Sequence, residues 1–458
     1  MIRYHAAHLL PISRPPIRDG TVVVHGGQIV YAGERAGAPP GADRDLGDAI
    51  LLPGLVNAHT HLELTAMRGF LEDLSFGAWI DTLQRAKRAV LTPERMLDAA
   101  RLGVAEGIMA GITTFADTCD SGVAMQALRE AGVRGIMYQE VFGPAPAQCE
   151  IAVAELRAKV ATHRALESQL VRVGISPHAP YTVSDDLFAA ASEFADAEGL
   201  PMAIHIAESE EEQRLVVEGA GAFADGLRRR GIAVEPRARS PIALLAALGV
   251  LAHRPMLIHC VRADERDIAV IADSGSPVAH CPVSNAKLGH GIAPLARMLG
   301  AGIRVGLGSD SVASSNRMDM LEEARVAALA QRAHLRSPEV LPAREALELA
   351  TLGGARALGL DARVGSLEPG KDADLVAFPA GELRTTPIHD PAAAAVFGIG
   401  GHAASFVMVG GEVLVDDGRL FRADPGLAGR VRATAAALAG WRAAESGRGA
   451  RGRPDTRR

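Results

Sequence analysis

Apolar and polar residues alternate differently at the ends of the chain than in its middle. The stretch TVVVHGGQIVY has branched residues on both sides of Gly26 and Gly27, and SFVMVGGEVLV repeats the pattern around Gly410 and Gly411. A glycine pair between two branched runs is typical of a tight β-hairpin. We therefore predict β-rich segments near both ends of the chain.

Between these ends, short apolar runs alternate with helical patterns of about 10–20 residues. The runs are LLPGLVNAH, GITTFADT, RGIMYQEVFG, VRVGISPHAP, PMAIHIAES, PMLIHCV, SPVAHCPVSN and IRVGLGSDS. Eight strand–helix repeats are typical of an α/β protein with a parallel (β/α)₈ TIM barrel. We assign this barrel to residues 53–363. The last stretch, 440–458, is basic and rich in glycine, and we expect a disordered tail there.

Composition narrows the class of protein. The chain has 458 residues, 48 Lys and Arg against 54 Asp and Glu, a net charge of −6 and 48% hydrophobic residues. It can bury a large core, and its acidic balance argues against a nucleic-acid partner. No apolar run reaches the roughly 18–20 residues of a membrane span. The N-terminal stretch has no secretory signal pattern, so we expect a cytoplasmic location and no membrane contact.

The cysteines do not form a disulfide framework. There are four of them in 458 residues, with no CxxC pair, beside 15 histidines. Reduced, partly buried thiols are the ordinary state of such cysteines. A metal site in this chain would therefore be built from histidine and carboxylate side chains.

Residues of this kind recur at the carboxyl ends of the predicted strands. His59 and His61 lie two apart after the first run, so both imidazoles face one side of a strand. His205 ends the fifth run and Asp310 ends the eighth. Three imidazoles and a carboxylate suit Zn²⁺, with Fe²⁺ or Mn²⁺ as alternatives. Because this end of a barrel carries the active site, we predict a catalytic metal site at these four residues.

Two further residues are candidates for proton transfer. A metal ion lowers the pKa of bound water toward about 7, and hydrolysis then needs a group that carries protons to the substrate. Glu208, three residues beyond His205, is our candidate shuttle, with a solvated loop carboxylate as the alternative. His259, which ends the sixth run, is placed to hydrogen-bond the water or the substrate, or is a buried core histidine. We count Asp310 in the catalytic set as well as in the metal set.

The motifs PGLVNAHTHLELTAMRG, SPHAPYTVS, HIAESEEE, LIHCV, HCPVSNAKLGHGIAP and VGLGSDS resemble those of the amidohydrolase superfamily. The resemblance is to its cytosine-deaminase-like and triazine-hydrolase-like branch, from about residue 50 to 425. It implies that the predicted metal ligands bind one ion, that Glu208 is the proton shuttle and that His259 orients the water. It also implies that residues 1–52 and 364–425 pair into a small β-sandwich beside the barrel.

The same resemblance bears on the number of metal ions. Binuclear relatives use a carboxylated lysine at the end of strand four, and VRVGISPHAPYTVS contains no lysine. This favours one divalent ion, Zn²⁺ first and Fe²⁺ second. Mononuclear members with this Glu–His–Asp arrangement are mostly deaminases of amino-substituted heterocycles. In such deaminases water adds to the ring carbon that bears the amino group, and ammonia leaves.

Four residues are candidates for contacting the substrate. His178, in SPHAPYTVS, resembles a ribose contact of adenosine-type deaminases. MRGFLEDLSFGAWIDTL resembles S-adenosylhomocysteine and methylthioadenosine deaminases, but Arg88 stands near the place of their ribose-binding glutamate. The HTHLEL motif resembles that of aminodeoxyfutalosine deaminases, and its Glu63 would contact a ring nitrogen or a sugar hydroxyl, or brace Arg68. The substrate of those enzymes carries a carboxylate that Arg85, Lys87 or Arg88 would pair, with a solvated helix face as the alternative for these three residues. Trp79 is placed to stack on a ring or to pack in the core.

We therefore expect a hydrolytic deaminase of an adenine nucleoside, with aminodeoxyfutalosine as the leading small-molecule substrate beside water. One alternative keeps the superfamily but changes the reaction to triazine dechlorination or deamination, guanine deamination or cyclic-amide hydrolysis. A catalytically silent barrel used for assembly or binding is a third hypothesis, against which the complete set of site residues counts. The resemblance also suggests a homodimer.

Overall fold

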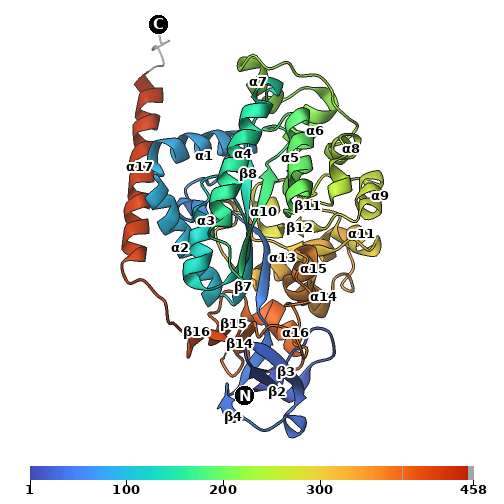
Figure 1. The fold of residues 1–458 in the computed structure, drawn as a ribbon, viewed down its shortest axis with the longest axis vertical. Helices are drawn as coiled ribbons and strands as arrows, with labels where there is room; N and C mark the ends of the chain where they lie inside the picture. Colours follow the sequence, from blue (N-terminus) through green and yellow to red (C-terminus); the bar gives the residue numbers. More distant parts are fainter. Residues whose placement is uncertain (384, 452–458) are drawn as a thin grey trace.

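Eight parallel strands at the centre of the chain follow the eight predicted runs (Figure 1). The computed structural model describes residues 1–383 and 385–451. Strands β6–β9 form one four-stranded sheet and β10–β13 another, and isolated parallel bridges join them at both edges, Ile175 to Met202 and Thr60 to Asp310. This arrangement is consistent with the predicted (β/α)₈ barrel. The bounds are β6 Leu55–Thr60, β7 Ile112–Cys119, β8 Arg134–Val141, β9 Val171–Pro177, β10 Ala203–Ile206, β11 Met256–His259, β12 Val278–His280 and β13 Val305–Leu307.

Helices connect the strands and cover their outer side (Figure 1). Thr92 and Ser184 begin two of the predicted helices, because each hydroxyl accepts a hydrogen bond from a backbone N–H of the first turn. No helix within residues 1–383 and 385–451 is long and apolar enough to cross a membrane. The α-helices are α1 Phe76–Val90, α2 Pro93–Met109, α3 Val123–Ala131, α4 Cys149–Arg164, α5 Asp185–Glu198, α6 Glu210–Glu218, α7 Ala222–Arg229, α8 Pro241–Ala247, α9 Glu265–Ser274, α10 Pro282–Lys287, α11 Leu295–Gly300, α12 Val312–Ser315, α13 Met320–Leu335, α14 Ala343–Glu348, α15 Gly354–Ala357, α16 Pro391–Ala394 and α17 Leu427–Arg451.

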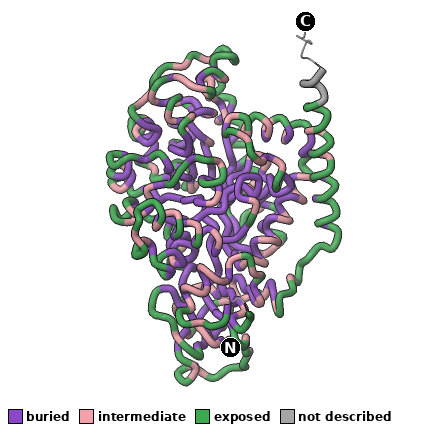
Figure 2. Tube along the Cα trace, turned by 180° about the vertical axis from the view of Figure 1, so that it is seen from behind, coloured by how far each residue is buried: buried purple, intermediate pink, exposed green. Residues whose placement is uncertain are grey.

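Buried residues gather at the centre of the molecule (Figure 2), and two clusters of them pack against the parallel strands. One cluster draws residues from both four-stranded sheets, and includes Ala116, Ile136, Tyr138, Ala203 and Ile258. A larger cluster packs between the strands and the helices, and includes Phe115, Met137, Val141 and Val173. Alternate residues of one strand thus face the interior and the helices, as the two-residue period of a strand requires.

The two β-rich ends of the chain pair in one sheet of nine strands. Strand β5 pairs with β1 in parallel and with β14 antiparallel, which joins the N-terminal and C-terminal segments. These strands form one connected sheet, and the two-layered packing of a sandwich stays a prediction. The bounds are β1 Ile2–Leu9, β2 Ile17–His25, β3 Gln28–Glu34, β4 Ala42–Asp45, β5 Ala49–Pro53, β14 Leu375–Pro379, β15 Phe406–Val409, β16 Glu412–Asp416 and β17 Arg419–Leu420.

Glycines sit where backbones approach closely in this sheet. Both predicted glycine-pair turns form hairpins, with positive φ at all four glycines. The turns meet each other, because a Cβ on Gly411 would lie 2.6 Å from the Cα of Gly27. Gly54 divides the first apolar run into β5 and β6, and a Cβ there would lie 2.1 Å from the Thr113 hydroxyl oxygen. The first run therefore contains two strands that belong to different sheets.

A buried ion pair fastens the terminal sheet to the parallel strands. Arg134, at the amino end of β8, is 1% exposed and donates to both carboxylate oxygens of Asp374, at 3.0 and 3.1 Å. Asp372 lies 3.0 Å from the same guanidinium. Both aspartates belong to the LEPGKDADLV segment, so this segment joins the two parts of the molecule.

The C-terminal helix α17 spans Leu427–Arg451 and packs along α1 and α2 (Figure 1). The disordered tail expected over 440–458 is therefore wrong at its start, and residues 452–458 lie outside the described part of the chain. Trp441 explains the difference, since its ring contacts that of Phe70 at 6.4 Å. An aromatic anchor of this kind holds a segment that its basic, glycine-rich composition marks as disordered.

Candidate active site

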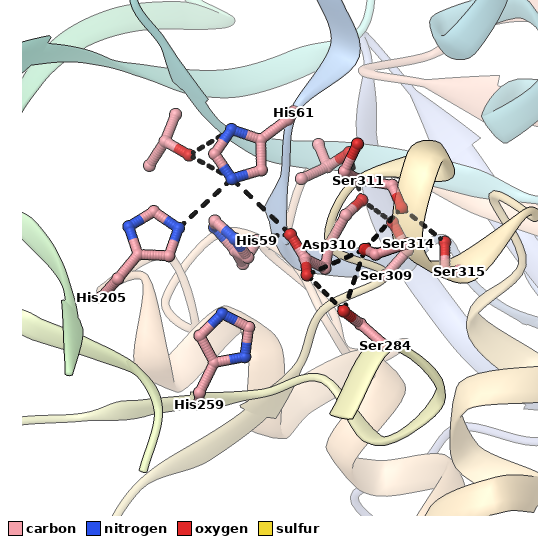
Figure 3. A network of polar contacts seen from close by, with 12 residues as sticks. His59, His61, His205, His259, Ser284, Ser309, Asp310, Ser311, Ser314 and Ser315 are labelled. Atoms are coloured by element: carbon pink, nitrogen blue, oxygen red, sulfur yellow. Dashed lines mark hydrogen bonds and ion pairs between the residues drawn. The ribbon is translucent and has the colours of Figure 1, made fainter. Parts of the chain in front are cut away.

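Three of the predicted metal ligands converge at the carboxyl ends of the strands. The Nε2 atoms of His61 and His205 lie 3.2 Å apart, and one nitrogen from each of His59, His61 and His205 falls within 4.8 Å of the others. Asp310 completes the group, with its Oδ1 3.3 Å from Nε2 of His59 and 3.6 Å from Nε2 of His61. Figure 3 shows His61 between His205 and Asp310. The structure thus brings together all four residues that the sequence singles out as ligands.

Local backbone irregularities aim these side chains inward. Strand β6 has a register shift between Asn57 and Thr60, and such a bulge turns the next side chains toward a site. His259 and Asp310 adopt φ of 75° and 55°, values that non-glycine residues rarely take outside functional sites. A Cβ on Gly308 would lie 2.8 Å from the Cβ of His59, so glycine lets this backbone approach β6.

Hydroxyl groups hold the ligands in place. Ser284 and Ser314 donate to Oδ2 of Asp310, at 2.5 and 3.1 Å, which leaves Oδ1 facing the histidines (Figure 3). The Thr118 hydroxyl lies 3.1 Å from Nδ1 of His61. Sequence reasoning missed these three residues, although Ser284 lies in the HCPVSNAK motif. Such outer contacts fix the orientation of metal ligands.

The chemistry of this donor set fits a divalent ion. Burial lowers the pKa of His59, His205 and His61, the last to about 4, so the imidazoles are neutral donors at neutral pH. Burial opposes ionisation of Asp310, but the neighbouring imidazoles outweigh it and hold its pKa well below the usual range. Among the described residues, neither ring nitrogen of His59 has a hydrogen-bond partner. Buried unpartnered nitrogens beside a carboxylate are the arrangement that a zinc-type ion completes.

Glu208 lies beside this cluster rather than in solvent. It is 4% exposed, and its Oε1 is 3.5 Å from Nε2 of both His259 and His290. Nδ1 of His259 lies 3.0 Å from the amide oxygen of Asn285, which fixes that nitrogen as the donor. The alternative of a solvated loop carboxylate is wrong for Glu208. His290, which the sequence left without a role, is its second partner.

His178 lies against the same cluster, next to His205. Its ring is 4.8 Å from that of His205, and its Nδ1 is 2.8 Å from the Thr182 hydroxyl. Its Nε2 is 4.0 Å from Oε1 of Glu140, a residue that sequence reasoning missed. The predicted contact of His178 with substrate stays a prediction, and its position next to a ligand supports it.

Glu63 is bound by protein donors. The Lys87 ammonium and the Ser121 hydroxyl contact its two carboxylate oxygens, and the Ser121 N–H lies 3.2 Å away. Burial raises the pKa of Glu63, but the Lys87 charge and these hydrogen bonds outweigh it and lower the pKa to about 2. Glu63 is therefore a buried carboxylate paired with Lys87, and its predicted substrate contact remains a prediction.

The other two substrate candidates lie on α1. Arg88 is exposed on α1 and lines a surface hollow together with Trp441 of α17. Trp79 packs beside Phe76, with ring centres 6.3 Å apart, and Phe76 contacts His290 at 4.5 Å. The helix turns its basic residue Lys87 inward and Arg88 outward, a distinction that spacing alone did not settle.

Comparison with known proteins agrees with this geometry. Residues 50–414 match the model of the amidohydrolase family. The chain belongs to the amidohydrolase family. Members of this family are hydrolases, and the chain acts on carbon–nitrogen bonds other than peptide bonds. The resemblance drawn from its motifs is confirmed.

Individual relatives sharpen the comparison. This amidohydrolase is 34% identical over 417 residues, 90% of the chain and 93% of the relative, to a 5-methylthioadenosine/S-adenosylhomocysteine deaminase of Moorella thermoacetica. It superposes on an adenosine deaminase of Xanthomonas campestris with bound zinc with a TM-score of 0.85 and 30% identity, over 95% and 98% of the two chains. An atrazine chlorohydrolase of Arthrobacter aurescens complexed with zinc gives a TM-score of 0.81 and 26% identity, over 96% and 100%.

Proposed function

We propose that this amidohydrolase is a hydrolytic deaminase of an adenine nucleoside that works with one divalent ion, Zn²⁺ foremost. The observation that carries the proposal is the buried carboxylate of Glu208 beside the histidine cluster, within 3.5 Å of two imidazoles. A carboxylate in this place can take a proton from water and give it to a ring nitrogen. The similarity over nearly the whole chain to deaminases that are named for adenine nucleosides supports this reaction.

Each residue of the site has a part in the proposed reaction. His59, His61, His205 and Asp310 hold the ion, which supplies a water of lowered pKa when it is bound. Glu208 would carry one proton from that water to the ring nitrogen next to the amino group. It would then carry a second proton, from the hydroxyl added to the ring carbon, to the amino group as this leaves as ammonia. His259 donates from Nδ1 to Asn285, so its Nε2 faces Glu208 and the reacting water. The buried surroundings keep bulk water away from these transfers.

The substrate within this class is a finer proposal. Deaminases of methylthioadenosine and S-adenosylhomocysteine are among the relatives, so a nucleoside with a substituted 5′ position is a reasonable first substrate. Aminodeoxyfutalosine, the leading candidate from the sequence, needs a partner for its carboxylate. Arg88 is exposed beside α17 and Lys87 is paired with Glu63, so the carboxylate would need a different cation.

Ammonia release by the zinc-loaded protein tests the proposal. The substrates are methylthioadenosine, S-adenosylhomocysteine, aminodeoxyfutalosine, adenosine, guanine and cytosine. We expect turnover of adenine nucleosides and a fall in kcat of about 10²–10⁴-fold in Glu208→Gln, with unchanged zinc content. The matched control is Glu210→Gln, an exposed carboxylate of the same acidic run, which should keep full activity.

Other outcomes would contradict the proposal at different levels. Turnover of guanine or cytosine alone would keep the metal-dependent deamination but refute the nucleoside substrate. No ammonia from any compound by the zinc-loaded protein would refute deamination and favour halide or cyclic-amide hydrolysis. A full rate in Glu208→Gln would refute the assigned shuttle.

A further inference from the structure

Glu140 is a buried acidic residue that the proposed reaction does not use. It lies at the carboxyl end of β8, where Ile136 and Tyr138 face the interior of the strand ring and Met137 and Val141 face the helices. The two-residue period of the strand places Glu140 on the interior side, one step above Tyr138. Its side chain therefore enters the same end of the interior as the metal ligands.

Few protein groups around Glu140 satisfy its carboxyl. It is 6% exposed, and within residues 1–383 and 385–451 its Oε1 has no hydrogen-bond partner. Ser176, its register partner on β9, is fully buried and has a hydroxyl that also lacks a partner in this range. Buried polar atoms in native proteins are nearly always paired, so two unpaired neighbours need a reason.

The charges around Glu140 do not explain why its oxygen is unpaired. Lys87 and Lys159 are the cations that act on Glu140, but the Lys87 ammonium contacts Glu63, and both ammonium groups lie 3.4 Å from a carboxylate oxygen of Asp120. Burial, with Asp120 and Glu63 adding to it, raises the pKa of Glu140 to about 8. A carboxyl kept in such surroundings is typical of a group that serves a ligand.

The position of Glu140 relative to Glu208 suggests what that ligand presents. Glu208 and His290 follow β10 and β12, whereas Glu140 lies at the end of β8 and His178 follows β9, with its ring 4.8 Å from that of His205. A heterocycle whose ring nitrogen meets Glu208 would direct its substituent toward Glu140. The ionised carboxylate has two acceptor oxygens, and two neighbouring hydroxyl groups are the donors that match them. Hydrogen bonds from such donors favour the charged form and would lower the raised pKa of Glu140 when the ligand binds.

We propose that Glu140 determines specificity by accepting hydrogen bonds from the vicinal hydroxyls of a sugar substituent on the substrate, with His178 beside it. This inference rests on the proposed function, since it places the amino-bearing ring at Glu208. Glu140 does not touch the reacting atoms. Its removal therefore weakens binding of the hydroxyl-bearing substrate and leaves the metal site intact.

Selectivity between two nucleosides tests the proposal. The zinc-loaded wild type, Glu140→Gln and Glu140→Ala are assayed with adenosine and with 2′,3′-dideoxyadenosine, which lacks both hydroxyls. We expect the kcat/KM for adenosine to fall about 10–100-fold in the variants, mainly through KM, and that for the dideoxy analogue to change little. Glu150→Gln, an exposed carboxylate at the start of α4, is the matched control and should match the wild type.

Three results would overturn the inference. An equal loss on both nucleosides, or no loss, would make Glu140 a structural residue while deamination stands. Glu140, His178 and His205 also lie within 4.8 Å of one another. Two zinc ions in the wild type and one in Glu140→Gln, measured by elemental analysis, would therefore make Glu140 a metal ligand.

If the zinc-loaded wild type deaminates neither nucleoside, the proposed function fails on its own. Calorimetric binding then decides the inference separately. Tighter binding of adenosine than of its dideoxy analogue, lost in Glu140→Gln, would support the role of Glu140. The same affinity for both compounds, or no binding, would refute it.

Discussion

Strand β8 carries a buried ionisable side chain at each end, and their surroundings differ. Arg134, at the amino end, has its charge balanced by two aspartates within 3.1 Å, whereas Glu140, at the carboxyl end, lies beside lysines that contact other carboxylates. Each of the two side chains has one buried polar atom without a partner in the described part of the chain. The histidine cluster, at the same end as Glu140, also has buried nitrogens without a partner among the described residues. In charge, therefore, the amino end of β8 is balanced by protein groups, whereas the carboxyl end leaves positions for an ion and a substrate.

The largest effect should follow from removing the divalent ion that we propose for the carboxyl end of the strands. Stripping divalent ions with a chelator should lower ammonia release by at least about 10³-fold, because an ion that acidifies water contributes several kcal/mol. Adding Zn²⁺ should restore the rate, and His205→Ala should abolish this recovery. Full activity in protein that elemental analysis shows to be metal-free would contradict a catalytic ion at the carboxyl end of the strands.

The opposite end should respond in stability. Arg134→Met leaves Asp374 buried without its cation, so we expect the free energy of unfolding in urea to fall by about 3–5 kcal/mol. The control is Arg363→Met, because Arg363 contacts the same Asp372 from a side chain that is 46% exposed, and about 1 kcal/mol or less is expected. Equal losses in the two variants would show that the buried pair is not special.

The next largest effect is the loss of stability in acid, which we expect from the histidine cluster and not from Arg134. Burial and the nearby His59 lower the pKa of His61 from 6.5 to about 4. The unfolded chain then binds more protons between pH 6.5 and 4, so the stability of the metal-free protein falls as the pH decreases through this window. His61→Gln should remove a part of this loss on the order of 3 kcal/mol, whereas the Arg134 guanidinium stays charged throughout. Identical pH profiles of wild type and variant would contradict the assignment.

The smallest effect is expected at Arg88. Since it is exposed beside α17, Arg88→Ala should change kcat/KM by about twofold or less for any nucleoside on the panel. Lys87 is its inward neighbour, and the two together define which face of α1 meets the site. A large loss confined to a carboxylate-bearing nucleoside would restore the substrate contact that the sequence suggested for Arg88.

The sequence predicts the parallel strands and the metal ligands because each leaves a local pattern. An apolar run that ends in histidine or aspartate is visible without knowledge of its neighbours. Glu140 has no such mark, since it lies within an apolar run like any residue of a buried strand. Its meaning depends on which residues stand beside it on β7 and β9, and only the folded chain specifies those neighbours.

Other differences have equally local causes. LLPGLVNAH forms a single apolar run, and only the contact of Gly54 with Thr113 reveals two strands. The rotation of α1 about its axis decides that Lys87, and not the adjacent Arg88, faces Glu63. The sequence does not show which of two adjacent basic residues points inward. Trp441 holds α17 against Phe70 through a contact between distant parts of the sequence, which composition does not encode.

The pairing of β5 with β14 has a consequence for how the protein is made. Strand β5 leaves the ribosome early, and β14, its partner, emerges only after all the parallel strands. During synthesis the edge of β5 is unpaired, and an unpaired edge invites association with other chains. Pairing of β5 with β14 is therefore a late folding step that joins residues far apart in the sequence. A chain that ends before residue 375 would keep the edge of β5 unpaired and prone to aggregation.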